Sequence, residues 1–160
     1  MVNTEQIIIL AILTMFVCTI GFKKSQKPKT IQLPDLTQLE FLHKPVDFEV
    51  TDLILLECFA TWCGPCKNQI PHISQLQNKF QQLKVISVSN ENIHVIETMV
   101  KEFPEMTKYN IASDPKFSLQ KLNTECDVEG IPHCFLFKNK NLIWDGHPAK
   151  VDEQIEEGLE

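Results

Sequence analysis

Residues 57–67 read Glu57-Cys58-Phe59-Ala60-Thr61-Trp62-Cys63-Gly64-Pro65-Cys66-Lys67, and the rest of the chain is organised around them. Two cysteines separated by two residues stand between an apolar run, 53–59, and a stretch with helical periodicity from about Pro65 to Leu83. A cysteine at a helix N-terminus meets unpaired N–H groups and the helix dipole, which stabilise a thiolate. The motif therefore predicts a redox-active pair in which Cys63 attacks and Cys66 resolves.

The other interpretation of this motif is half of a zinc site. A four-cysteine zinc site needs a second C-x-x-C, and the sequence contains none. The remaining cysteines form no regular framework, so we expect Cys58 to be a small buried apolar residue and Cys126 to lie in a loop. No cofactor is expected.

Composition and charge narrow the class of protein. With 160 residues and 43% hydrophobic content, the chain suits one domain with an appendage. The net charge is −6, and the first 30 residues carry four lysines and one glutamate, so residues 31–160 carry −9. This acidic balance argues against nucleic acid as a partner.

Residues 7–22 form an uncharged apolar stretch followed by four lysines, at positions 23, 24, 27 and 29. Sixteen residues of helix reach about 24 Å, against a hydrocarbon core of about 30 Å, so a short anchor and a signal peptide both fit. The lysines favour an anchor. We therefore divide the chain into a membrane anchor or signal peptide at 1–24, a tether at 25–33 and a folded domain at 34–160. If the segment is cleaved as a signal peptide, the domain would be secreted or lie in the secretory pathway.

Strand and helix patterns alternate through the domain. Short strand pieces with a turn near Lys44-Pro45 are expected within 36–50, and central strands at 53–59 and 85–89. Helices are expected at 65–83, from a cap at 90–92 to about 102, at 116–123 and at 151–159, with an extended piece at 109–112 and an antiparallel hairpin at 135–137 and 142–144. This order predicts an α/β fold with parallel strands joined by right-handed crossovers.

Two motifs together resemble the thioredoxin superfamily over about residues 34–160. These are Trp62-Cys63-Gly64-Pro65-Cys66-Lys67 and the Gly130-Ile131-Pro132 that precedes the hairpin. The resemblance implies a thioredoxin-like fold, a central mixed β-sheet flanked by helices, with Pro132 in the cis form opposite the C-x-x-C. Pro132 lies 66 positions after Cys66, so the chain is similar to the membrane-tethered TlpA/ResA-like group, with an extra β/α insertion between these two residues.

The same resemblance implies a protein-disulfide reductase that works by dithiol–disulfide exchange. Its partners would be a protein disulfide substrate and an upstream thiol reductant, and the chain would act as a monomer. Glu57 stands where thioredoxins have a buried acid, and it would serve as a base for Cys66. The alternative is that Glu57 points outward from a strand edge.

The expected substrate-binding residues are Trp62, Gly64, Pro65, Ile131, Pro132 and His133. Trp62 would form one wall of a groove, although simple packing would also explain it. Ile131 and Pro132 would form the lip, where an extended substrate could pair with the Ile131 backbone. Strand alternation sends His133 and Cys134 to opposite faces, and we expect His133 nearer the site and Cys134 in the core.

The sequence also allows a second function. Cys63 and Cys66, with either His133 or Cys134, could form a module that binds or delivers a metal ion.

Overall fold

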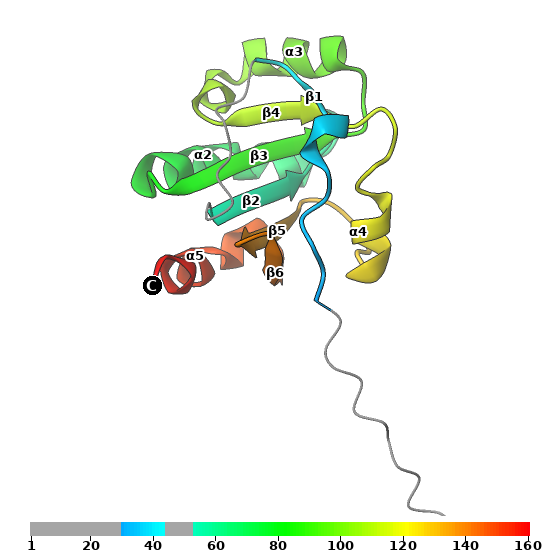
Figure 1. The fold of residues 1–160 in the computed structure, drawn as a ribbon. Helices are drawn as coiled ribbons and strands as arrows, with labels where there is room; N and C mark the ends of the chain where they lie inside the picture. The colour runs from blue at the N-terminus through cyan, green and yellow to red at the C-terminus, as the bar shows by residue number, and fades with distance from the viewer. Residues whose placement is uncertain (1–29, 44–52) are drawn as a thin grey trace, which may run out of the picture.

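The computed structural model describes residues 30–43 and 53–160, and its strands form one mixed sheet (Figure 1). The strands are β1 Glu40–Phe41, β2 Leu53–Cys58, β3 Leu83–Ser89, β4 Asn110–Ser113, β5 His133–Lys138 and β6 Asn141–Gly146. Their order across the sheet is β1-β4-β3-β2-β5-β6. β2, β3 and β4 run parallel, whereas β1, β5 and β6 pair antiparallel with their neighbours.

Helices cover both faces of the sheet. The α-helices are α2 Gly64–Lys79, α3 Ile93–Glu102, α4 Gln120–Glu125 and α5 Asp152–Leu159, and the short 3-10 helices are η1 Leu36–Gln38, η2 Pro104–Lys108 and η3 Pro148–Lys150. The crossovers from β2 to β3 and from β3 to β4 advance in the same direction, so the right-handed rule puts α2 and α3 on one face. The apolar cluster on that face includes side chains of α2, α3 and α5. Side chains of α4 and of residues 31–39 pack on the other face.

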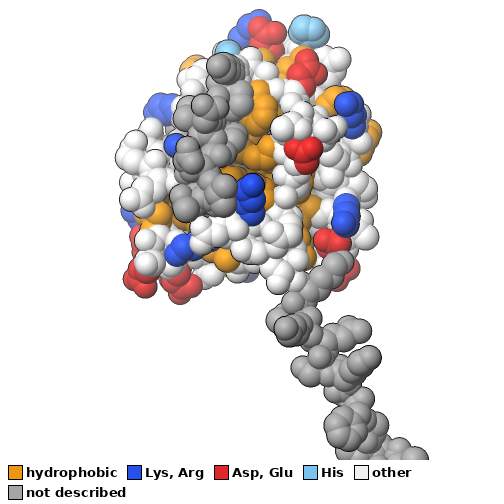
Figure 2. All heavy atoms as spheres, viewed as in Figure 1, with side chains coloured by type: hydrophobic (Ala, Val, Ile, Leu, Met, Phe, Trp, Pro, Cys, Tyr) orange, Lys and Arg blue, Asp and Glu red, His pale blue; other side chains and the backbone are white. Residues whose placement is uncertain are grey.

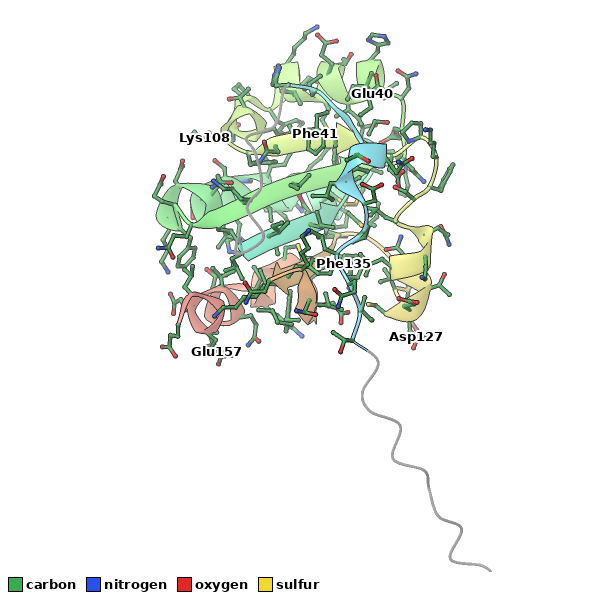
Figure 3. The ribbon with its side chains drawn as sticks, in the orientation of Figure 1. Glu40, Phe41, Lys108, Asp127, Phe135 and Glu157 are labelled. Carbon is green, nitrogen blue, oxygen red and sulfur yellow. A yellow bond between two sulfur atoms is a disulfide. The ribbon has the colours of Figure 1, made fainter. Side chains whose placement is uncertain are left out.

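β2 lies between β3 and β5 in the middle of the sheet and is covered on both faces. Every residue from Leu53 to Cys58 is buried, as the continuous apolar run predicts. Phe135 of neighbouring β5 is also fully buried, whereas Lys108, Asp127 and Glu157 lie at the periphery (Figure 3). On the face shown in Figure 2, lysine and acidic side chains are interspersed.

Two predicted helix boundaries are wrong. α2 ends at Lys79 rather than near Leu83, because Leu83 begins β3 and lies opposite Leu53 in the ladder. α4 begins at Gln120 rather than at residue 116, because the Asp114 carboxylate bonds to backbone N–H groups in the turn that precedes the helix. From residue 53 onward, the remaining predicted strands, helices and hairpin agree to within about two residues, which is ordinary for helix and strand ends. Of the strand pieces expected within 36–50, the described residues contain β1, and residues 36–38 form the 3-10 helix η1 instead.

Between α2 and Pro132 the chain forms β3, α3, η2, β4 and α4. We predicted that part of this region is an insertion relative to smaller relatives, and this stays a prediction.

The N-terminal predictions fall mostly outside the described residues. The predicted anchor at 1–24, most of the tether at 25–33 and the strand pieces after residue 43 belong to this group. Within the described ranges, no helix is long and apolar enough to span a bilayer. The last tether residues pair with the hairpin, because the Leu33 N–H donates to the Lys140 carbonyl at 2.8 Å and Gln32 forms a bridge with Asn141.

Candidate active site

Cys63 and Cys66 form a disulfide at the N-terminus of α2, with their sulfur atoms 2.11 Å apart. Cys63 is the N-cap of the helix, and its Sγ accepts a hydrogen bond from the Cys66 N–H at 3.1 Å. A thiolate at this position would keep that bond and gain from the helix dipole. Cys63 is 4% exposed and Cys66 1%, so in the disulfide form Cys63 is less accessible than its predicted role led us to expect. Which cysteine attacks stays a prediction.

Gly64 and Pro65 lie between the cysteines, in the first turn of α2, and both are exposed. A proline at this position gives up no helical hydrogen bond, because N–H groups of the first turn have no partner within the helix.

Glu57 is buried on the face of the sheet that carries this centre. It lies on central β2, only 3% exposed, so the alternative of an outward-facing edge residue is wrong. The hydroxyl of Ser87, its register partner on β3, donates a hydrogen bond to the Glu57 carboxylate. Burial raises the pKa of Glu57 to about 7, against the opposing effect of the Ser87 hydrogen bond. A carboxyl group with such a pKa can exchange a proton near neutral pH, although its action on Cys66 stays a prediction.

Cys134 and His133 lie on opposite faces of β5, as strand alternation predicts, but Cys134 rather than His133 lies on the face of Cys63. Cys134 is the register partner of Glu57 and belongs to the same apolar cluster as Cys63 and Cys66. Its burial in the core is confirmed. His133 lies on the other face, where its Nε2 is 3.0 Å from Asp145 Oδ2 and its ring contacts Phe135. The expectation that His133 faces the Cys63 side is therefore wrong. It depended on the register of β5 against β2, which the sequence does not show.

The lip of the site is formed by the loop before β5. The Ile131–Pro132 peptide bond is cis, as predicted. The Cys63 Sγ lies 3.8 Å from the Ile131 carbonyl oxygen, so this loop faces the disulfide directly. The Ile131 backbone is thus placed where an extended substrate could pair with it, although that role stays a prediction.

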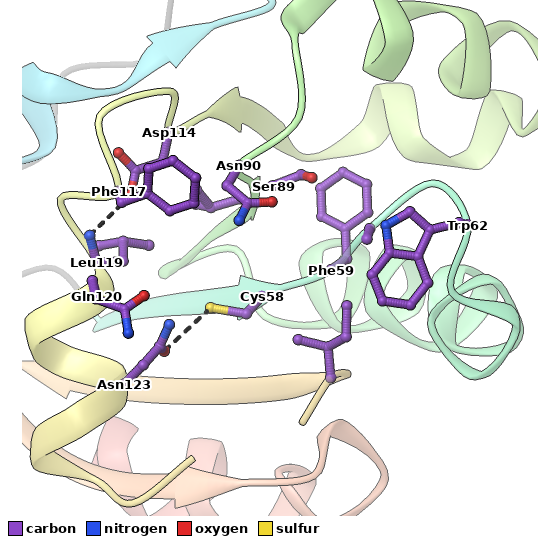
Figure 4. Close-up of a pocket in the computed structure, with 13 residues that line it drawn as sticks. Cys58, Phe59, Trp62, Ser89, Asn90, Asp114, Phe117, Leu119, Gln120 and Asn123 are labelled. Atoms are coloured by element: carbon purple, nitrogen blue, oxygen red, sulfur yellow. Dashed lines mark hydrogen bonds between the residues drawn. The ribbon is translucent and has the colours of Figure 1, made fainter. Parts of the chain in front are cut away.

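A groove of about 160 Å³ lies between the turn that precedes Cys63 and the turn that precedes α4 (Figure 4). Trp62 and Ile131 line the groove, and Trp62 is 74% exposed, so packing does not explain this residue. The opposite wall comes from the turn before α4 and from α4 itself. It includes Phe117, Leu119, Gln120 and Asn123. Cys58 lies in the groove wall with its Sγ 3.9 Å from Asn123 Oδ1, and burial raises the pKa of its thiol to about 12. Such a thiol stays protonated and unreactive at neutral pH.

Sequence reasoning missed several residues of this site. Ser87 looked like an ordinary residue of a buried strand, and only its register opposite Glu57 gives it significance. Phe117 was placed inside a helix, whereas it sits in a turn with a positive φ of 54° and is 54% exposed. The Asp114-Pro115 that precedes it was a usable signal, because such pairs favour a turn.

The alternative metal site gains no support from the geometry. Within residues 30–43 and 53–160, no group of three or more His, Cys, Asp or Glu side chains is arranged to hold a metal ion.

Comparison with known proteins decides the family. The thioredoxin family model matches residues 36–121, more than half of the chain. The chain belongs to the thioredoxin family. Among curated thioredoxins and relatives, it is 26% identical over 102 residues to the thioredoxin-like protein YneN of Bacillus subtilis. The aligned region covers 63% of this chain and 59% of YneN. It is also 26% identical over 110 residues to Thioredoxin-1 of Schizosaccharomyces pombe, covering 67% of this chain and 82% of that protein.

Solved structures show the same thioredoxin-like fold. A thiol:disulfide interchange protein of the thioredoxin family from Chlorobium tepidum superimposes with a TM-score of 0.62 at 17% identity, over 84% of this chain and all of that one. StoA from Bacillus subtilis superimposes with a TM-score of 0.52 at 22% identity, over 69% of this chain and 84% of StoA. At these identities the likeness concerns the fold. The predicted fold class and superfamily are therefore confirmed.

Proposed function

We propose that this thioredoxin-family protein reduces disulfides in polypeptide substrates by dithiol–disulfide exchange. The observation that carries the proposal is the Cys63–Cys66 disulfide at the start of α2. Its Cys63 sulfur faces the Ile131 carbonyl, and the disulfide lies on the same face of the sheet as buried Glu57. Family membership and the thioredoxin-like fold support the same activity.

The reaction proceeds in two exchange steps. The Cys63 thiolate attacks a substrate disulfide, forms a mixed disulfide with one substrate sulfur and releases the other as a thiolate, which takes up a proton. Cys66 then gives its proton to the Glu57 carboxylate and attacks the Cys63 sulfur. This closes the Cys63–Cys66 disulfide and releases the second substrate thiol. An upstream dithiol returns two electrons to the protein by the reverse exchange.

The groove lined by Trp62 and Ile131 supports a polypeptide as substrate. Two exposed aromatic side chains, Trp62 and Phe117, stand at its edges, and the amides of Asn90 and Gln120 are exposed along it. The one carboxylate in its lining, Asp114, already accepts hydrogen bonds from Ser118 and Leu119 on both oxygens. A groove with apolar edges, whose carboxylate is already hydrogen-bonded, suits an extended segment with an apolar side chain.

Trapping tests the proposal. In the Cys66→Ser variant, Cys63 should stay joined to its substrate, because no second thiol can resolve the mixed disulfide. Mass spectrometry would identify the trapped partner, and Cys63→Ser is the control that should trap nothing. An absence of trapped protein from cells expressing Cys66→Ser would contradict the exchange mechanism.

The direction of transfer is a separate part of the proposal. The Gly-Pro pair between the cysteines resembles that of reducing thioredoxins, so we expect a reduction potential of about −270 mV. Equilibration with glutathione measures this potential. A reduction potential of about −120 mV would make the protein an oxidant instead.

The attachment to a membrane is also proposed. The apolar stretch at 7–22 and the lysines that follow it support a single N-terminal anchor, with the thioredoxin domain as a tethered monomer. Extraction of membranes at high pH distinguishes an anchor, which stays in the pellet, from a cleaved signal peptide, which leaves a shorter protein in the supernatant.

A further inference from the structure

Glu91 binds the turn that carries the active-site cysteines. It lies after the end of β3, thirty residues from Thr61 in the sequence. Its Oε2 accepts a hydrogen bond from the Thr61 backbone N–H at 2.6 Å, and its Oε1 accepts one from the Thr61 hydroxyl at 2.7 Å. Both oxygens of one carboxylate are thus directed at a single residue of the turn, and hydrogen bonds to a charged acceptor are the stronger kind.

Glu91 is itself held in place by the ends of two strands. The Ser89 hydroxyl donates to Glu91 Oε2 at 3.0 Å and accepts from the Glu91 N–H at 3.2 Å. The Ser113 hydroxyl, at the end of β4, donates to the Glu91 carbonyl at 2.6 Å. Ser89 and Ser113 are both buried, so Glu91 links the turn to the rigid sheet.

The turn is fixed at its two ends, because the Phe59 N–H donates to the Val88 carbonyl at 3.1 Å and Cys63 is joined to Cys66 of α2. Glu91 holds the part between these ends. The Cys63 N–H donates to the Ala60 carbonyl at 3.1 Å, which closes the turn but does not attach it to the sheet. Trp62, at its tip, is largely exposed and contributes little packing. Yet this turn sets both the Trp62 side of the groove and the distance of Cys63 from the Ile131 carbonyl.

We infer that Glu91 is a positioning residue, whose carboxylate holds Thr61 so that Cys63 and Trp62 keep their orientation toward the substrate. The inference rests on the proposed disulfide exchange. The Glu91 carboxylate bonds to Thr61 and Ser89 and does not line the groove, so its contribution comes from keeping the reacting groups aligned.

Fluorescence and kinetics on the full chain test this role together. The protein has two tryptophans, so a Trp144→Phe background leaves Trp62 as the reporter. In Glu91→Ala, the anisotropy of Trp62 should fall, and kcat/KM for insulin reduction should fall about tenfold, the effect of losing a charge-assisted hydrogen bond. Glu91→Gln should recover most of both, because its amide can accept from the Thr61 N–H and donate to the Thr61 hydroxyl.

Matched variants make the test specific. Glu97→Ala removes the same charge from the exposed side of α3, where Glu97 pairs with Lys101 at 3.1 Å, and should leave both readouts unchanged. Thr61→Val removes only the hydroxyl bond and should lower the anisotropy and kcat/KM by less. In a Glu91→Ala background, Thr61→Val should cause no further loss. This variant also serves if Glu91→Ala does not fold.

The inference is overturned if Glu91→Ala matches Glu97→Ala in both anisotropy and kcat/KM, or if Thr61→Val and Glu91→Ala effects simply add. Failure of the wild-type protein to reduce insulin would instead contradict the proposed function, and the anisotropy would still report on the turn.

Discussion

At the level of single residues, the main feature is an acid buried in an apolar strand. Glu57 has Ser87 on one neighbouring strand and Cys134 on the other. Burial raises the pKa of Tyr109, and the nearby Glu57 charge raises it further. A buried acid such as Glu57 costs stability when ionised, so its presence in the core points to a chemical use. Two predictions follow from its pKa.

The first concerns the free energy of unfolding. The pKa of Glu57 is raised from an ordinary 4.5 to about 7 by burial, so between these values the unfolded chain releases a proton that the folded protein retains. Stability should therefore fall as the pH rises through this window and level off above it. Between pH 5 and pH 8 the oxidised wild type should lose up to roughly 3 kcal/mol more than Glu57→Gln. Urea unfolding at both pH values measures the difference, and equal losses would contradict it.

The second concerns catalysis. Without a base, Cys66 must lose its proton to water, so Glu57→Gln should slow insulin reduction on the order of 10²-fold and lose its pH dependence from pH 6 to 9. Ser87→Ala is the informative partner variant. The Ser87 hydrogen bond lowers the pKa of Glu57, so its removal should raise that pKa and shift the pH profile of insulin reduction to higher pH. Unchanged reduction rates in Glu57→Gln over this range would exclude the base role.

At the level of elements, α4 and the turn before it form the groove wall opposite Trp62 (Figure 4). The turn is shaped by buried Asp114, which bonds to the N–H groups of Ser118 and Leu119 at 2.9 Å each. It is this side chain, rather than helix propensity, that places Phe117 at the edge of the groove.

Replacing Asp114 should therefore loosen the wall. We expect Asp114→Ala to lower the free energy of unfolding by about 1–2 kcal/mol, the usual cost of losing a capping carboxylate. Thermal and urea unfolding measure this loss. Asp127→Asn, at an exposed position after α4, is the control and should change stability by less than about 0.5 kcal/mol. An equal effect of the two substitutions would show that the Asp114 bonds contribute nothing specific.

The aromatic edges of the groove should matter only for large substrates. Trp62→Ala and Phe117→Ala should each raise KM for insulin about five- to tenfold, because each removes an exposed aromatic contact. The rate with a small disulfide reagent should stay the same, since such a reagent does not reach both edges. Ile143→Ala removes a comparably exposed side chain of β6 and should affect neither substrate. A loss of activity toward the small reagent would point to the disulfide rather than the groove.

At the level of the whole molecule, the sheet is packed on both faces, and adjacent residues of β2 report on each. Leu55 belongs to the cluster under α2, and Leu56 to the cluster under α4. Both are fully buried. Each leucine-to-alanine change should cost about 2–5 kcal/mol of unfolding free energy, because it leaves a cavity in a closed layer. Val95→Ala on the exposed side of α3 should cost far less, and a small loss for Leu56→Ala would mean that the α4 face is loosely packed.

Local patterns in the sequence were sufficient for much of this protein. The C-x-x-C after an apolar run fixed the disulfide at a helix start, because a strand, a turn and a helix signal lie next to one another along the chain. The continuous run at 53–59 predicted a strand buried on both faces. The cis bond before Pro132 was implied by the resemblance to the thioredoxin superfamily, and the structure contains it.

Only the tertiary structure decided how distant residues meet. The sequence cannot show that Ser87 and Cys134 flank Glu57, that His133 turns toward Asp145, or that Glu91 bonds to Thr61, because each depends on strand register or on a contact across many residues. A shift of one residue in register would turn each strand side chain to the other face of the sheet. The sequence by itself therefore determined the chemistry of the two cysteines, whereas the structure determined which groups surround and orient them.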